Sequence, residues 1–88
     1  MRTPQEMENF VREQLKSTDF MQAFNPTQMT EAFFPEYASQ ALSGNKVAIQ
    51  KIVNSYRQKG IEAFGHTESA RMQSFGYFAT GIYWSGKL

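Results

Sequence analysis

The sequence contains no cysteine and only one histidine, His66, among its 88 residues. The absence of cysteine excludes disulfide bonds and thiolate metal sites. With a single histidine, a metal site would need carboxylates from elsewhere in the chain, so we interpret His66 as a surface or cap residue. We therefore expect no metal ion and no cofactor.

Long apolar runs are also missing. No segment approaches the roughly 20 apolar residues that a membrane-spanning helix needs, and the first 19 residues are charged and lack the apolar centre of a signal peptide. We therefore expect a cytoplasmic protein without a transmembrane segment. Strand-like patterning is nearly absent as well. The aromatic residues of 75–84 would suit a strand, but we expect a helix there because the neighbouring segments are helical.

Motifs of catalysis and phosphate binding do not occur. The chain has no glycine-rich phosphate loop, no nucleophile elbow and no histidine-containing metal motif. Glu6, Glu8 and Glu13 lie on one expected helix, where Glu6 caps the start and the other two fall on the polar arc, so paired acid–base chemistry is not indicated. We predict that the protein is not an enzyme; chemistry at Glu6, Glu8 or His66 is the alternative.

The net charge of +1 argues against a protein that binds nucleic acid by neutralising phosphates. The charge is nevertheless uneven, since residues 1–45 carry three basic and six acidic side chains whereas residues 46–88 carry six basic and two acidic ones. Two such halves could pair within one chain or head to tail between chains. Two ordinary solvated surfaces would give the same pattern.

The strongest helical pattern covers residues 45–64. Asn45 is a good N-cap residue, because its side-chain oxygen can accept a hydrogen bond from the first helical turn. We expect the rest of the chain to be organised around this amphipathic helix. Its apolar residues recur at steps of three and four, at Ile49, Ile52, Val53, Tyr56, Gly60, Ala63 and Phe64.

Three earlier signals also predict helix starts. Thr3 and Glu6 flank a proline in a capping box, Asn25 precedes another proline in the same arrangement, and Pro35 ends one helix and opens the next. A short turn capped by Thr18 or Asp19 is expected through residues 20–24. In the helix after Asn25, the residues expected to face inward are Met29, Ala32 and Phe33.

The segment after residue 64 allows two interpretations. Either Gly65 ends the long helix and Thr67 caps a last one, or a single helix continues to Trp84. We favour the break, because Gly60 and Gly65 each cost a helix about 1 kcal/mol. The fold class is thus an all-α, small helical bundle of four to five short-to-medium amphipathic helices in one domain, residues 1–88, which could be oligomeric. The helices are expected at about 4–17, 26–34, 35–43, 46–64 and 68–84.

The chain has thirteen aromatic residues, eight of them phenylalanine. A packed core is one explanation, and an exposed surface that contacts a protein or an apolar particle is the other. Tyrosine and tryptophan suit such a boundary because each joins an apolar ring to a polar tip. The candidate interaction surface comprises Phe75, Tyr77, Phe78, Tyr83 and Trp84, with Arg57, Lys59 and Arg71 at its rim.

The run FMQAFNPTQMTEAFFPEY, together with RQKGIEAFGHTESARMQSF, resembles the phasins, which coat polyhydroxyalkanoate granules. The resemblance covers about residues 20–79, includes the step from Ile61 to Phe64, and departs from the family at Gly65 and His66, where phasins usually stay helical. It implies a non-enzymatic coat protein whose amphipathic helices cover an apolar surface and self-associate. The alternative is a compact helical module, of a kind that a phage could encode, that binds one partner protein and inhibits or regulates it.

Overall fold

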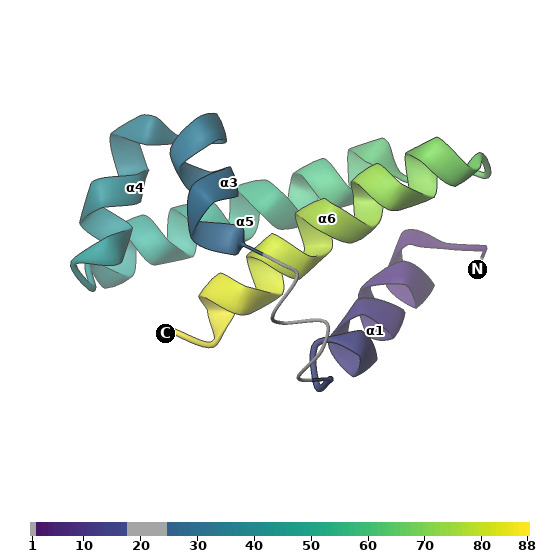
Figure 1. Ribbon diagram of the computed structural model, residues 1–88, viewed down its shortest axis with the longest axis horizontal. Coiled ribbons are helices and arrows are strands. Elements are labelled where there is room, and N and C mark those ends of the chain that lie inside the picture. Colours follow the sequence, from purple (N-terminus) through teal and green to yellow (C-terminus); the bar gives the residue numbers. More distant parts are fainter. Residues whose placement is uncertain (1, 18–24) are drawn as a thin grey trace.

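A computed structural model describes residues 2–17 and 25–88. These residues form the helices α1 (Pro4–Gln14), α3 (Pro26–Phe33), α4 (Pro35–Leu42), α5 (Lys46–Ala63) and α6 (Glu68–Ser85), and they contain no strand (Figure 1). The predicted all-α class is therefore confirmed. The turn expected through residues 20–24, with its cap at Thr18 or Asp19, lies outside the described residues.

Helix starts follow the capping signals of the sequence. In α1, α3, α5 and α6 the side chain of the N-cap residue accepts a hydrogen bond from the backbone N–H three residues later. The four cap residues are Thr3, Asn25, Asn45 and Thr67, and each bond is 3.1 Å long. One detail differs: the Glu6 carboxylate accepts from the backbone N–H of Arg2 at 3.4 Å and from the Thr3 hydroxyl at 3.5 Å, and not from the Thr3 backbone as in a full capping box.

The last two helices are separate, as we favoured. Helix α5 ends at Ala63, and α6 begins at Glu68 after its cap residue Thr67. Only α1 deviates noticeably in length, because it ends at Gln14 and not near Ser17.

Helix α6 is the centre of the bundle, where the sequence had suggested α5. It packs against α5 along its length and also contacts α1 and α3, whereas α5 packs mainly against α6 and α4 (Figure 1). A helix with neighbours on several sides carries apolar residues around most of its circumference. The sequence of α6 therefore lacks a single apolar stripe like the one from which α5 was predicted.

Helices α5 and α6 run antiparallel and approach closely at two glycines. A Cβ atom at Gly60 would lie 2.9 Å from ring atoms of Phe78, and one at Gly81 would lie 3.2 Å from Cβ of Tyr56. The Ser74 hydroxyl donates a 2.8 Å hydrogen bond to the carbonyl of Gly60. Each glycine thus makes room for a large ring on the opposite helix.

The core has two parts on different sides of α6. One part joins α4 and α5 to the C-terminal half of α6, and its buried residues are Ala41, Ala48, Ile49, Ile52, Tyr56 and Trp84. The other joins α1 to α6 through Met7, Val11, Phe78 and Ala79. Since α1 and α5 both lie against α6 but make few contacts with each other, a groove remains between them.

The inward face of α3 was predicted wrongly in part. Ala32 is exposed and the Phe33 side chain is 48% exposed, whereas the polar Thr30 is fully buried. Thr30 tolerates burial because its hydroxyl donates to the carbonyl of Pro26 and accepts from Nε1 of Trp84, both at 2.8 Å. Only Met29, which packs against the core, agrees with the prediction.

The buried Tyr56 hydroxyl has no hydrogen-bond partner among the described residues. Thr30 lies nearby, but its proton goes to Pro26 and cannot also be given to Tyr56. Burial raises the pKa of Tyr56 above its ordinary value of 10.0, an effect that Tyr77 reinforces. The folded state therefore holds this proton more tightly than the unfolded chain does.

We expect Tyr56→Phe to leave the free energy of unfolding at pH 7 unchanged or to raise it by up to about 1 kcal/mol, because an unpaired buried hydroxyl is removed. In the wild type, the folded state binds the Tyr56 proton more tightly than the unfolded chain. This contribution to the free energy of unfolding is fully present below pH 10 and is lost as the pH rises through the raised pKa. Urea denaturation at neutral and alkaline pH should show that Tyr56→Phe loses less stability than the wild type. The half-buried Tyr83→Phe serves as control, and a loss above about 1 kcal/mol for Tyr56→Phe at pH 7 would contradict the assignment.

Candidate functional site

The structure does not bring the predicted interaction residues together on one surface. Phe78 and Trp84 are each only 2% exposed and belong to the core, so the prediction that they form a surface is wrong. Their rings are enclosed because α6 has neighbours on several sides. The remaining predicted residues are distributed over five places on the molecule. Tyr77 and Lys59 meet beside α3, Arg57 reaches towards α1, Phe75 contacts Phe10, and Tyr83 and Arg71 lie part-exposed near opposite ends of α6.

Lys59 lies among three aromatic rings. Its Nζ atom is 5.7 Å from the ring centroids of Phe33 and Phe34 and 5.8 Å from that of Tyr77. Ammonium groups within about 6 Å of a ring face are attracted to it. Two turns earlier on α5, Lys51 lies 5.4 Å from the ring centroid of Tyr37. We call this set the lysine–aromatic edge; its members are Phe33, Phe34, Tyr37, Lys51, Lys59 and Tyr77.

Local structure and packing hold the rings of this edge in place. Phe34 is both the C-cap of α3 and the N-cap of α4, because Pro35 opens the new helix. Its ring packs edge-on against buried Tyr56 at 5.1 Å between centroids, and Tyr77 lies 6.3 Å from the same ring. Phe33 contacts Tyr77 edge-on at 5.8 Å. The rings therefore form a supported platform beneath Lys59.

No carboxylate in the described part of the chain forms an ion pair with the lysines of this edge. Within residues 2–17 and 25–88, the ion pairs are Lys16 with Glu13 and Arg57 with Glu8, and neither involves Lys51 or Lys59. An aromatic face attracts an ammonium group but carries no net charge. The edge therefore presents two positive charges next to half-exposed apolar rings.

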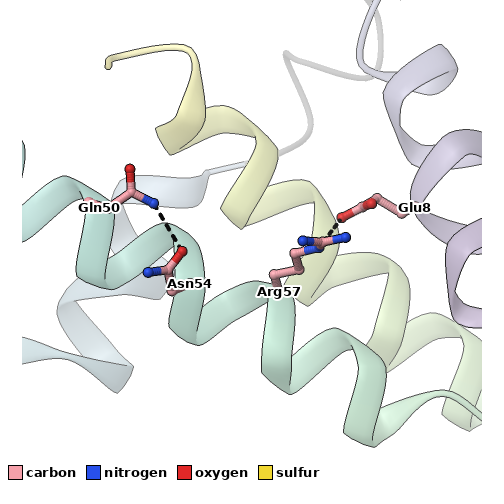
Figure 2. Close-up of polar contacts among 4 residues, drawn as sticks. All are labelled: Glu8, Gln50, Asn54 and Arg57. Carbon is pink, nitrogen blue, oxygen red and sulfur yellow. Dashed lines mark hydrogen bonds and ion pairs between the residues drawn. The ribbon is translucent and has the colours of Figure 1, made fainter.

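The second surface feature is the groove between α1 and α5. Arg57 extends from α5 and Glu8 from α1, and the Arg57 Nε atom donates to a Glu8 carboxylate oxygen at 3.2 Å (Figure 2). Nearer the start of α5, the Gln50 amide donates to Asn54 at 2.9 Å, a pairing within one helix (Figure 2). The bridge from Arg57 to Glu8 crosses the groove and divides it into two recesses.

Glu8 was predicted to lie on the polar arc of α1, but its side chain is only 12% exposed. It follows Met7, which packs on α6, and thus sits at the border of the contact, facing α5. A carboxylate in such a position needs a compensating partner, which Arg57 supplies. Sequence reasoning missed Glu8 because its partner is 49 residues away in the chain.

The other titratable candidates have structural positions. Glu6 caps α1, and His66 is exposed in the segment before α6, with its ring 5.9 Å from that of Phe64. The described part of the chain holds no group of three or more His, Cys, Asp or Glu side chains that could bind a metal ion. That the protein is not an enzyme remains a prediction.

The fold defines a small all-α protein, and none of its described helices combines the length and the apolar character needed to traverse a bilayer. No family model, no curated protein and no solved structure matches the chain.

Proposed function

We propose that this protein is a non-enzymatic helical module that binds an acidic surface of a partner protein through the lysine–aromatic edge, and that it regulates the partner by covering that surface in the cytoplasm. The observation that carries the proposal is the position of Lys59, whose ammonium group lies over three rings without a carboxylate partner among the described residues. A carboxylate on the partner would supply the missing counter-charge.

The composition of the edge also favours a protein partner. Aromatic side chains are enriched at the centres of protein interfaces, and rings that are already fixed lose little conformational entropy on binding. Phe33 is the most exposed of these rings, at 48%, while Phe34 and Tyr77 are half-buried against Tyr56. Phe33 would therefore supply apolar contact area and Lys59 the charge.

The compact shape supports docking more than the formation of an extended coat. The radius of gyration of the Cα atoms is 12.5 Å, close to the roughly 12 Å of a compact domain of this length. The rings of Phe78 and Trp84 are each only 2% exposed, so they offer almost no area with which to cover another surface. The apolar side chains that remain exposed are suited to a single interface of limited area.

The proposal predicts that tagged protein captures one stoichiometric partner from native lysate of its source cells. The triple variant Phe33→Ala, Lys51→Gln, Lys59→Gln should reduce the captured amount at least about tenfold, because it removes two charges and one apolar contact. Quantitative mass spectrometry of the eluates measures the amount. Lys16→Gln is the control, since Lys16 is exposed, lies outside the edge and pairs with Glu13. Capture that is equal for the triple variant and the wild type would contradict the proposal.

A phasin-like coat is the second candidate, and exposed large apolar side chains favour it. Those with at least two-fifths of their surface exposed are Phe10, Phe33, Leu42, Val47, Ile61, Met72 and Leu88. Such a protein would self-associate and would partition onto hydrophobic particles. Light scattering of the purified protein and sedimentation with polymer particles distinguish this function from capture of a single partner protein.

A further inference from the structure

The groove between α1 and α5 combines an apolar floor with an arginine that is only partly engaged. Its larger recess has a volume of about 320 Å³ and is lined by Pro4, Gln5, Glu8, Arg57, Ile61 and Phe78. The smaller recess, of about 40 Å³, lies on the other side of the bridge from Arg57 to Glu8 and is lined in part by Arg12, Val53 and Ile82. The larger volume is at the lower end of the range for small-molecule sites.

Arg57 is held in an orientation that leaves part of its guanidinium group free. The hydrogen bond to Glu8 uses Nε, and no other residue that the structure describes pairs with the two terminal amino groups. The Arg57 side chain is 65% exposed, whereas that of Glu8 is 12% exposed. Two terminal N–H groups in a fixed fork match the two oxygens of a carboxylate.

The charge balance of the groove favours an anion. Two arginines, Arg12 and Arg57, line it against the single carboxylate of Glu8, which gives an excess of one positive charge. Beside these charges, the exposed Ile61 and the part-exposed Pro4 give the larger recess apolar surface, and the core residue Phe78 closes its floor. A ligand that fits both features has one carboxylate and an uncharged apolar tail.

We propose that this groove binds a small aliphatic monocarboxylic acid, with the carboxylate on the free edge of Arg57 and the hydrocarbon chain in the larger recess between α1 and α5. Arg12 adds positive potential from the neighbouring recess without a direct role in orienting the chain. Glu8 positions Arg57 and is not itself a contact of the ligand. This site is separate from the lysine–aromatic edge, and its test requires no partner protein.

The test is an NMR titration of the full-length, nitrogen-15-labelled protein with octanoate. Amide shifts of Gln5, Ile61 and Phe78 should change in a saturable manner. Octanol, which has the same chain length without a carboxylate, should bind at least about tenfold more weakly, and Arg57→Gln should weaken octanoate binding by a similar factor. Lys87→Gln removes one positive charge outside the groove and should leave the affinity for octanoate unchanged.

Two further variants keep the test decisive if Arg57→Gln disturbs folding by leaving Glu8 unpaired. Arg12→Gln retains the ion pair between Arg57 and Glu8. It should weaken octanoate binding about threefold, because the groove loses part of its positive electrostatic potential. Arg57→Lys keeps the charge but lacks the fork, and should also bind more weakly. Equal affinities for octanol and octanoate would mean that the groove takes an apolar occupant without recognising a carboxylate, and no saturable shift with either would mean that it binds neither; each result overturns the proposal.

Discussion

Trp84→Ala should lower the free energy of unfolding by about 3–5 kcal/mol. The Trp84 side chain is 2% exposed and packs in the core formed with α4 and α5, while its Nε1 atom donates to Thr30 of α3 at 2.8 Å. The substitution leaves a large cavity and removes one partner of the buried Thr30 hydroxyl. Domains of this size have total stabilities of the same order, so a substantial unfolded population is expected. Urea denaturation followed by far-UV circular dichroism measures the effect.

Tyr83→Ala is the matched control, because Tyr83 is adjacent to Trp84 and also aromatic but only half-buried. Its ring packs edge-on against Trp84 at 5.4 Å and under Lys87 at 5.2 Å. We expect Tyr83→Ala to lower the free energy of unfolding by about 1 kcal/mol. Equal losses for the two variants would show that Trp84 is not a core residue and would revive the surface role predicted from the sequence.

Gly60→Val should destabilise the protein by about 3 kcal/mol through overpacking. A Cβ atom at Gly60 would lie 2.9 Å from three atoms of the Phe78 ring. That ring cannot move aside easily, because Met7 and Val11 of α1 enclose it from the other side. The same denaturation experiment gives the magnitude, and Gly60→Ala should destabilise in the same direction by a smaller amount.

Gly76→Ala is the control for the effect of glycine on helix propensity. Gly76 also lies inside a helix, but the nearest atom to its added Cβ is the Met29 methyl carbon, at 3.8 Å. Glycine loses more backbone entropy than alanine when a helix forms. Gly76→Ala should therefore raise the free energy of unfolding by up to about 1 kcal/mol. Opposite signs at Gly60 and Gly76 are therefore expected; a stabilising Gly60→Ala would contradict the close helix contact.

The helices were predictable because their starts are encoded locally. Asn25, Asn45 and Thr67 each need only a backbone N–H three residues ahead, and Pro35 needs no partner to divide α3 from α4. Such signals do not depend on how the chain folds back on itself. The break between α5 and α6 was favoured because Gly60 and Gly65 both lower helix propensity; the helix does end just before Gly65, with Thr67 as the next cap, but Gly60 lies inside α5.

The functional surfaces were less predictable because they depend on contacts between distant segments. Phe78 and Tyr77 are adjacent in the sequence and both aromatic, but Phe78 fills the space left by Gly60 whereas Tyr77 lies under Lys59. Aromatic content alone could not separate these roles. Phe33 and Phe34 directly precede Pro35, so the sequence does indicate that two aromatic rings lie at a helix junction. That these rings pack against α5 and α6 follows only from the tertiary structure.

The antiparallel contact between α5 and α6 also has a consequence for the order of folding. These helices are consecutive in the chain and joined only by residues 64–67, so closing their connection costs little entropy and their pairing should be an early event. Helix α1 is synthesised first, but its docking surface on Phe78 and Ala79 emerges much later. During translation, Met7 and Val11 therefore remain without their binding site until the α5–α6 hairpin is complete.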